Sequence, residues 1–487
     1  MLFNSYEYLF VFLPLTVIIY FLLNRHRYTK AATAWLVLAS LVFYSWWNVK
    51  YLALITGSIL VNFGAGSALV NMGRSRPDNR SRKYVLLFGV LFNIFLLGYY
   101  KYADFFIANL NALSGLQIGL QKVILPLGIS FFTFTQIAYL VDTYKDTARE
   151  YDFLNYALFV TFFPHLLAGP IIHHKEMMPQ FAGVRNKVLN YRNLSLGLFL
   201  FFIGLFKKII IADELAPVAN AGFDAASHLT LVEAWITSLS YTFQLYFDFS
   251  AYTDMALGAA LLFNIRLPFN FNSPYKALDI TDFWRRWHMT LSRFLRDYVY
   301  IPLGGNRQGT FRTYQNLMAT FLVGGLWHGA GWTFVFWGFL HGAGTLVHRL
   351  WSRINVPLPR ALAWLITFNF VNIAWVFFRA RSWPDAVKVV KGMAGINGVV
   401  LSEGVAAKLG FVQKYGVTFG QLFFQYIHHN VWLLLIVLLL VTVYAKNSDE
   451  MVRTFKPTWK TALFSGTIAI YALLSMSKVT EFLYFNF

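Results

Sequence analysis

A histidine in a glycine-rich segment has the clearest potential for chemistry in this sequence. His328 lies in the run Gly324-Gly-Leu-Trp-His-Gly-Ala-Gly-Trp332, between two apolar stretches. An imidazole is costly to bury in a membrane helix and is seldom left there without a partner or a function. The glycines at 329 and 331 would let the backbone break, or let another group approach the ring closely. We therefore predict that His328 is a general base, with a purely structural histidine as the alternative.

A second histidine belongs to a segment with helical periodicity. With Thr281 or Asp282 as the N-cap, segment 282–298 predicts an amphipathic helix with His288 on its buried face. The residues that recur on that face are Trp284, Trp287, His288, Leu291, Leu295 and Tyr298. The residues on the other side are Arg285, Arg286, Arg293 and Arg296. These arginines either anchor the helix to lipid headgroups or bind the phosphates of a donor, and His288 is either functional or a packed structural residue.

Polar side chains also interrupt an aromatic, apolar stretch at 241–254. They are Gln244, Asp248, Ser250 and Asp254. Acidic groups at membrane depth face a cavity or pair with a cation. They could shape a tunnel, pair with the arginines that follow Asp282, or relay protons in a transporter.

The other histidines carry weaker signals. Segment 163–174 contains two prolines, which predict a bent or re-entrant element. The segment itself contains no Asp or Glu, so we expect no metal site at its histidines, which are His165, His173 and His174. His341 and His348 share one face of the span that follows Trp332, and we interpret both as structural.

The composition requires a membrane environment for these residues. Of 487 residues, 57% are hydrophobic and only 13% are charged, whereas a soluble domain carries about a quarter charged residues. The chain has no cysteine, which excludes disulfides, thiolate metal sites and a cysteine nucleophile. This composition predicts an all-α polytopic membrane protein with a single membrane domain over 1–487.

Apolar stretches of near-spanning length recur along the chain and predict about eleven to fourteen membrane helices. Candidate spans lie at 8–23, 32–47, 51–70, 84–100, 122–141, 153–172, 193–212, 230–247, 249–265, 314–327, 331–350, 361–378, 430–445 and 461–478. Some are expected to be tilted or re-entrant, because polar residues interrupt them. Segment 382–424 is less apolar and predicts an extramembrane excursion with an amphipathic part.

Basic loops give the expected orientation. The loops at 25–30 and 74–83 are rich in Lys and Arg, and the loops between them are aromatic. The positive-inside rule then places the basic loops in the cytoplasm and the amino terminus outside. We interpret the first span as retained rather than as a cleaved signal peptide. Much of the net charge of +19 lies in these loops and reports topology, whereas the part near 285–312 flanks a buried histidine and could meet an anionic donor. No nucleic acid partner is needed to explain the charge.

The residues resemble the membrane-bound O-acyltransferase (MBOAT) family. The central matches are Asp282-Phe-Trp-Arg-Arg-Trp-His288, Leu295-Arg-Asp-Tyr298, Pro302-Leu-Gly-Gly305 and Leu326-Trp-His-Gly329. Further matches are Leu125-Pro-Leu-Gly-Ile-Ser-Phe131, Ala168-Gly-Pro170, Gly204-Leu-Phe-Lys-Lys208, Phe247-Asp-Phe-Ser250, Asn270-Phe-Asn-Ser-Pro-Tyr275, Trp375-Val-Phe-Phe-Arg379 and Leu483-Tyr-Phe-Asn-Phe487. Together they look like the bacterial branch that contains alginate O-acetyltransferase and peptidoglycan O-acetyltransferase membrane subunits.

The resemblance implies helices ringed around a central tunnel, with residues 282–332 as the catalytic core region. It implies that His328 is catalytic and that His288 lines the reaction tunnel. The expected donor is acetyl-CoA from the cytoplasm, with no bound cofactor, and the expected acceptor is an extracytoplasmic polysaccharide such as alginate. The expected partner is a periplasmic esterase-like acetyltransferase, and the location is the bacterial inner membrane. We expect the donor or substrate to contact Arg285, Arg286, Arg293, Arg296, Trp287, Trp327 and Asp248.

Other functions stay open from the sequence. A secondary transporter would explain the spans and the buried acids, although no internal repeat is seen. A scaffold that docks a periplasmic acetyltransferase is a second alternative. Peptidoglycan O-acetylation or D-alanyl transfer within the same family is a third. No P-loop, zinc-protease motif or nucleophile elbow is present, which favours direct transfer assisted by a base.

Overall fold

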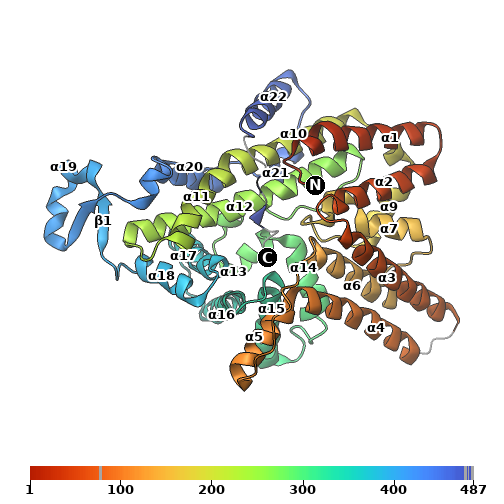
Figure 1. Ribbon diagram of the computed structural model, residues 1–487, viewed down its shortest axis with the longest axis horizontal. Coiled ribbons are helices and arrows are strands. Elements are labelled where there is room, and N and C mark those ends of the chain that lie inside the picture. The colour runs from red at the N-terminus through yellow and green to blue at the C-terminus, as the bar shows by residue number, and fades with distance from the viewer. Residues whose placement is uncertain (76–78, 477–479, 481, 484–487) are drawn as a thin grey trace. The chain divides into compact units, whose positions relative to one another are not determined.

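The computed structural model describes residues 1–75, 79–476, 480, 482 and 483, and these are mainly α-helical (Figure 1). Arg76 of the basic loop and residues 484–487 of the carboxyl-terminal motif lie outside the described residues. The chain forms two compact units, each built from separate stretches of sequence. The first unit comprises Met1–Leu205, Ala251–Phe269 and Val452–Phe487, and the second comprises Phe206–Ser250 and Asn270–Met451.

The first unit contains helices from the amino-terminal half and one from the carboxyl-terminal end. They are η1 (Tyr8–Phe12), α1 (Leu13–Arg25), α2 (Thr29–Ser45), α3 (Lys50–Ser75), α4 (Asn79–Leu97), η2 (Gly98–Tyr102), α5 (Ala103–Ser114), α6 (Ile129–Tyr144), α7 (Phe153–Thr161), α8 (Phe163–Leu166), α9 (His174–Ala182), η3 (Val184–Lys187), α10 (Tyr191–Phe206) and α22 (Trp459–Leu474).

The second unit contains most of the predicted chemistry. Its elements are η4 (Lys207–Ala212), α11 (Asp213–Asn220), η5 (Ala221–Ala225), η6 (Pro274–Lys276), α13 (Ile280–Arg286), α14 (Met289–Leu295), η7 (Arg296–Tyr300), α15 (Gly309–His328), α16 (Trp332–Ile354), α17 (Arg360–Arg379), α18 (Trp383–Met393), β1 (Val399–Ser402), η8 (Glu403–Val405), α19 (Ala406–Leu409), η9 (Gly410–Tyr415), β2 (Val417–Gly420), η10 (Phe423–Tyr426) and α20 (Val431–Tyr444). Helix α12 (Leu231–Leu262) begins in the second unit and ends in the first, and α21 (Ser448–Arg453) also crosses the boundary.

The described part of the chain confirms a polytopic, helical membrane protein. Five stretches are helical, long and apolar enough to cross a membrane: Tyr8–Arg25, Lys50–Gly73, Arg80–Ser114, Tyr191–Ala225 and Arg360–Arg379. Three shorter apolar helices accompany them: Thr29–Ser45, Val431–Tyr444 and Trp459–Leu474. The total of eleven to fourteen spans stays a prediction.

Two of the predicted spans form one helix. The sequence predicts separate spans at 230–247 and 249–265, with Asp248 between them. In the structure α12 is continuous over 32 residues. The physical reason is that Lys208 donates to Asp248 at 2.8 Å, so the carboxylate is neutralised inside the helix rather than exposed at a break. A charged residue therefore does not mark a boundary here.

Two other predicted spans are shorter than expected. The span at 122–141 becomes helical only at Ile129, because Pro126 and the left-handed Gly128 (φ +73°) precede it. The span at 153–172 ends as a regular helix at Thr161. One turn, α8, and an irregular stretch to His173 follow it, which agrees with the bent element predicted for 163–174.

One cluster joins the basic loop 74–83 to the end of α6. Arg82 donates to the carbonyl oxygens of Thr143 and Tyr144 and forms an ion pair with Asp146 at 3.1 Å. The start of α4 and the end of α6 therefore lie at the same end of the first unit. Alternating spans require this arrangement, but which side of the membrane it faces stays a prediction.

The less apolar segment 382–424 forms a small structure of its own. Helix α18 buries one face through Ala386, Val389 and Met393, as an amphipathic helix does. Strands β1 and β2 then pair in parallel, with Val399 opposite Val417. Among the described residues this segment contains no candidate span, which agrees with the predicted excursion.

Candidate active site

His328 is the last residue of α15 and is 4% exposed. A Cβ atom at Gly329 would collide with the ring of Phe334, whereas one at Gly331 would find its nearest atom at 3.6 Å. Helix α15 ends at His328 and α16 begins at Trp332, so the backbone break predicted for this glycine segment is confirmed, and Gly329 itself contacts Phe334 closely. Phe334 occupies this space at the turn between α15 and α16.

Two glycines bring α15 and α16 together beside the histidine. A Cβ atom on Gly338 would lie 2.5 Å from the carbonyl oxygen of Phe321 and 3.3 Å from the Cα atom of Gly325. The two helix backbones thus touch at this point, as small residues allow in membrane proteins. The close packing positions the ring of Trp337, on α16, 5.2 Å from the ring of His328.

Aromatic rings enclose the imidazole of His328 within the second unit. Trp337 meets it edge-on at 89°, and Phe378 of α17 lies at 5.0 Å between ring centroids. The ring of Trp327 lies at 4.8 Å. These rings bury the imidazole and limit the access of water to it.

His288 lies at a break in the helix predicted for 282–298. Helix α13 ends at Arg286, His288 adopts a left-handed conformation (φ +42°), and α14 begins at Met289. The continuous amphipathic helix is therefore wrong, although the burial of His288 is confirmed, since it is 0% exposed. The predicted N-cap is also wrong, because Asp279 accepts the hydrogen bond from the backbone N–H of Asp282.

Asn270 stabilises this break. Its side-chain oxygen accepts hydrogen bonds from the backbone N–H of Thr290 at 3.2 Å and from the hydroxyl of Thr290 at 2.6 Å. Its carbonyl oxygen accepts from the N–H of Met289 at 3.0 Å. The first turn of α14 is thus capped by a residue from a distant segment, which frees the backbone at His288 to leave the helical path. Sequence reasoning missed this role, and its only signal was the Asn270-Phe-Asn motif.

The structure brings the two predicted histidines together. The ring centroids of His288 and His328 are 6.4 Å apart, although the residues are forty positions apart in sequence. Trp327 contacts both rings, at 6.1 Å and 4.8 Å, and Phe249 of α12 packs edge-on against His288 at 4.8 Å. Two imidazoles in one aromatic enclosure can act on one small substrate.

We expect Asn270→Ala to weaken catalysis through His288, because the capped break would lose two of its hydrogen bonds. The predicted loss is about 1–3 kcal/mol of stability together with a lower acyl transfer rate. Asn272→Ala is the matched control, since its side chain accepts from Asn447 and not from α14. Thermal unfolding and initial transfer rates would be measured on both proteins. Equal rates for the two variants would contradict this role of Asn270.

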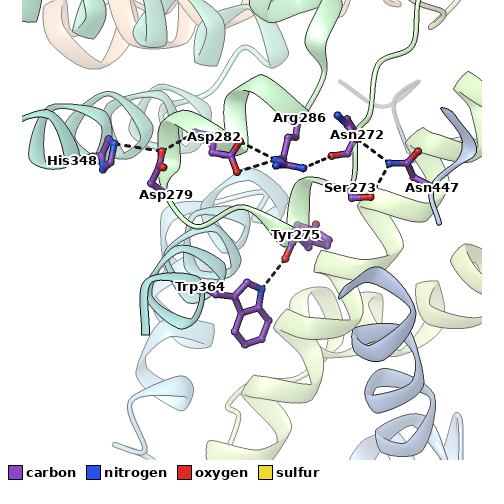
Figure 2. Close-up of polar contacts among 9 residues, drawn as sticks. All are labelled: Asn272, Ser273, Tyr275, Asp279, Asp282, Arg286, His348, Trp364 and Asn447. Carbon is purple, nitrogen blue, oxygen red and sulfur yellow. Dashed lines mark hydrogen bonds and ion pairs between the residues drawn. The ribbon is translucent and has the colours of Figure 1, made fainter. Parts of the chain in front are cut away.

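A row of polar contacts holds α13 in place (Figure 2). His348 on α16 lies 3.5 Å from the carboxylate of Asp279, and Asp282 accepts two 2.9 Å contacts from Nε of Arg286. Arg286 also donates to the carbonyl oxygen of Asn272. Because Asp282 already neutralises Arg286, this arginine stabilises the helix rather than presenting a free charge.

The four predicted arginines do not act as one cluster. Arg286 pairs with Asp282, and Arg296 pairs with Asp297 at 2.7 Å. Arg293 is half-buried. Arg285 is exposed on α13 and lines an open pocket together with residues of α15 and α16.

Trp287 is a core residue in this structure. It is 3% exposed, stacks on Phe283 at 5.7 Å and packs against Trp375 at 4.9 Å. The neighbouring Trp284 donates from its indole N–H to Nδ1 of His341 at 3.1 Å. The predicted structural interpretation of His341 agrees with this contact. Whether Trp287 or Trp327 contacts a substrate stays a prediction.

Asp248 forms an ion pair with Lys208, which lies 2.8 Å away and also contacts Asp213 at 2.8 Å. Lys208 and Asp248 are almost fully buried. Lys208 is the cation that sequence reasoning missed, although its place in the apolar run after Gly204 was a signal. Such a buried pair holds η4 against α12.

The histidines of the first unit bind protein groups. His165 makes a hydrogen bond with the carbonyl oxygen of Phe159, and His173 lies 3.6 Å from Asp142. His174 binds Glu150 at 3.3 Å. Burial would raise the pKa of Glu150, but hydrogen bonds from His174 and two backbone N–H groups hold this pKa below its ordinary value. Within the described ranges no group of three potential ligands is arranged for a metal ion.

Comparisons with known proteins give an independent indication. The sequence profile of the membrane-bound O-acyltransferase family matches residues 9–382. A peptidoglycan O-acetyltransferase of Helicobacter pylori is 47% identical, over 100% of this chain and 98% of that protein. A probable alginate O-acetylase of Pseudomonas aeruginosa is 41% identical, over 83% of this chain and 76% of that protein. A teichoic acid D-alanyltransferase of Bacillus subtilis is 28% identical, over 52% of this chain and 69% of that protein.

Proposed function

Because the chain belongs to the membrane-bound O-acyltransferase family and is therefore an acyltransferase, we propose that it moves acetyl groups from cytoplasmic acetyl-CoA to an extracytoplasmic polysaccharide. The observation that carries this proposal is the pair of buried histidines, His288 and His328, in one aromatic enclosure. An enclosure of aromatic rings that limits the access of water suits the transfer of an acyl group to a hydroxyl, because water would otherwise hydrolyse the thioester.

In the proposed mechanism His328 is the general base. A ring nitrogen of His328 accepts the proton of the acceptor hydroxyl as the hydroxyl oxygen attacks the thioester carbon. The carbon–sulfur bond then breaks, and the thiolate leaves with the proton that His328 returns. His288 orients the thioester carbonyl or the acceptor within the same enclosure.

The relatives support a cell-envelope polymer whose hydroxyl groups accept the acetyl group. The peptidoglycan O-acetyltransferase matches the full chain, whereas the alginate O-acetylase matches 83% of it. This coverage favours peptidoglycan over alginate as the polymer. A periplasmic esterase-like acetyltransferase would receive the acetyl group on a serine, or the sugar hydroxyl would receive it directly.

The same proposal places the protein in the bacterial inner membrane with its amino terminus outside. This placement rests on the basic loops, because membrane proteins retain Lys and Arg on the cytoplasmic side. A secondary transporter is the competing function, and family membership favours acyl transfer over it.

The test uses the purified protein reconstituted in liposomes with isotopically labelled acetyl-CoA. We expect the label to move to an added glycan, or to water at a low rate, in a protein-dependent manner. Ion-driven solute uptake without any thioester cleavage would instead identify a transporter and overturn the proposal. Liposomes prepared with purification fractions that lack the protein are the negative control.

A further inference from the structure

A pocket of about 700 Å³ lies in the first unit, and its lining combines basic, amide and apolar side chains. The arginines that line it come from four separate segments: Arg185 on η3, Arg192 on α10, Arg266 after the end of α12, and Arg453 at the end of α21. None of the described residues that line the pocket is an Asp or a Glu. The pocket therefore gathers positive charge from segments that are distant in sequence.

Three of these arginines keep their charge available for a ligand. Within the described ranges, no carboxylate forms an ion pair with Arg185, Arg192 or Arg266. All three residues are exposed. Arg453 differs from them, because it has a partner within the protein. Three guanidinium groups thus remain to bind an anion in this pocket.

Amide side chains fix the backbone of two of the arginines. Gln180 accepts a hydrogen bond from the backbone N–H of Arg266 at 2.8 Å and donates to the carbonyl oxygen of Arg266 at 3.1 Å. Asn190 accepts from the backbone N–H of Arg192 at 3.0 Å. These contacts position both arginines at the pocket and leave their side chains to the ligand.

A third amide holds the segment that carries Arg185. Asn264 donates to the carbonyl oxygen of Asn186, the next residue, at 3.0 Å. Its own side-chain oxygen accepts from Asn193 of α10 at 2.9 Å. The start of α10, the end of α12 and η3 are therefore joined around the polar end of the pocket.

The apolar wall of the pocket lies beside the crossing of α10 and α12. A Cβ atom on Gly197 would lie 2.8 Å from the carbonyl oxygen of Gly258, so the two backbones touch there. Leucines next to these glycines, or one turn further from them, line the pocket: Leu196 and Leu200 on α10, and Leu257 and Leu261 on α12. The lining thus changes from arginine and amide groups to leucine along both helices.

The polar end of the pocket lies at the level where membrane spans begin and end. Arg192 stands in the first turn of the candidate span Tyr191–Ala225. Tyr20, near the end of the candidate span Tyr8–Arg25, packs edge-on against Phe263 at 5.5 Å. The pocket therefore lies at the same end of the first unit as the basic loop 25–30, at the depth of lipid headgroups.

We propose that this pocket binds an anionic phospholipid, with Arg185, Arg192 and Arg266 holding its phosphate and the leucines of α10 and α12 contacting an acyl chain. The inference does not depend on the proposed acyl transfer. Guanidinium groups bind phosphate oxygens through paired N–H donors. A zwitterionic lipid fits less well, because its ammonium group would meet like charges and no carboxylate among the described lining residues. A soluble phosphate shares the headgroup chemistry but has no apolar part to place against the leucines.

The test uses the full chain, purified in detergent and stripped of native lipid, with dioctanoyl phosphatidylglycerol as the probe. We expect Arg192→Gln/Arg266→Gln to raise the dissociation constant of this lipid about tenfold or more, because two charged contacts to the phosphate are lost. The lipid should also raise the unfolding temperature of the wild type, and much less that of the double variant at the same concentration. An unchanged dissociation constant would overturn the proposal.

Arg25→Gln is the matched control for surface charge. Arg25 is an exposed arginine at the same end of the first unit, and it does not line the pocket. Its replacement should leave the dissociation constant unchanged, and a loss equal to that of the double variant would show unspecific attraction and overturn the site. Arg185→Gln, from another segment, should also weaken binding. This variant keeps the test valid if the double variant is misfolded before lipid is added.

Two further probes identify the class of ligand in the wild type. Dioctanoyl phosphatidylcholine has the same chains with a zwitterionic headgroup, and glycerol phosphate has the anionic group without chains. We expect each to bind about tenfold more weakly than phosphatidylglycerol, or weaker still. Equal binding of phosphatidylcholine would show that the charge of the headgroup is not recognised. Equal binding of glycerol phosphate would identify a site for soluble phosphates, and either result would overturn the assignment to an anionic phospholipid.

Discussion

Replacing His328 with Ala is expected to reduce acetyl transfer by about two to four orders of magnitude, which is the usual contribution of a positioned general base. The ring is buried and held between Trp337 and Phe378, and the imidazole of His288 lies 6.4 Å from it between ring centroids. Initial rates with labelled acetyl-CoA would measure the loss. Binding of coenzyme A should stay close to that of the wild type.

The control is His328→Gln, which keeps a hydrogen-bonding side chain of similar size but has no basic nitrogen. If the ring acts as a base, both variants are inactive while both remain folded in the membrane. If the ring only fills space, the glutamine variant retains most of the activity. Near-normal transfer in His328→Ala would remove His328 from the mechanism.

The second large effect is expected at the buried ion pair. Lys208→Met leaves the carboxylates of Asp248 and Asp213 without their cation, and breaking a buried pair in this way costs about 3–5 kcal/mol. We expect a clear fall in the unfolding temperature of the variant in detergent. The affinity of the folded variant for the donor should change little.

Lys207→Met provides a close control for this experiment. Lys207 is the neighbouring residue, is only half-buried, and donates to the hydroxyl of Ser448 at 2.8 Å. Its replacement should cost much less stability than that of Lys208. The double variant Lys208→Met/Asp248→Asn should recover part of the lost stability, because one of the unpaired charges is removed. If instead Asp248→Asn alone raises KM for acetyl-CoA without lowering the unfolding temperature, Asp248 binds the donor and the pair is not primarily structural.

The partners of the histidines in the first unit cannot be read from a local sequence pattern. Their sequence predicted no metal site, and His173 and His174 each face one carboxylate, Asp142 and Glu150. Neither carboxylate is within helical ligand spacing in the sequence. Asp142 belongs to α6 and Glu150 to the loop between α6 and α7, so the pairings depend on how these segments pack, which periodicity does not describe.

The sequence by itself determined the class of protein, the family and the burial of His288. Apolar length reports a membrane span directly, because each span must satisfy its backbone hydrogen bonds within one continuous segment. Periodicity likewise predicted the burial of His288, although the face assigned to a continuous helix over 282–298 does not hold across the break at that residue. Composition and motif order were therefore sufficient for these conclusions.

Only the tertiary structure decided the break at His288 and its distance to His328. The break depends on Asn270, which reaches Thr290 from a separate segment, and the 6.4 Å between the two rings depends on how α15 packs. The partner of Asp248 was hidden for the same reason, since Lys208 is forty residues away in sequence. Contacts between distant residues are selected by packing and charge neutralisation in three dimensions, and no local pattern records them.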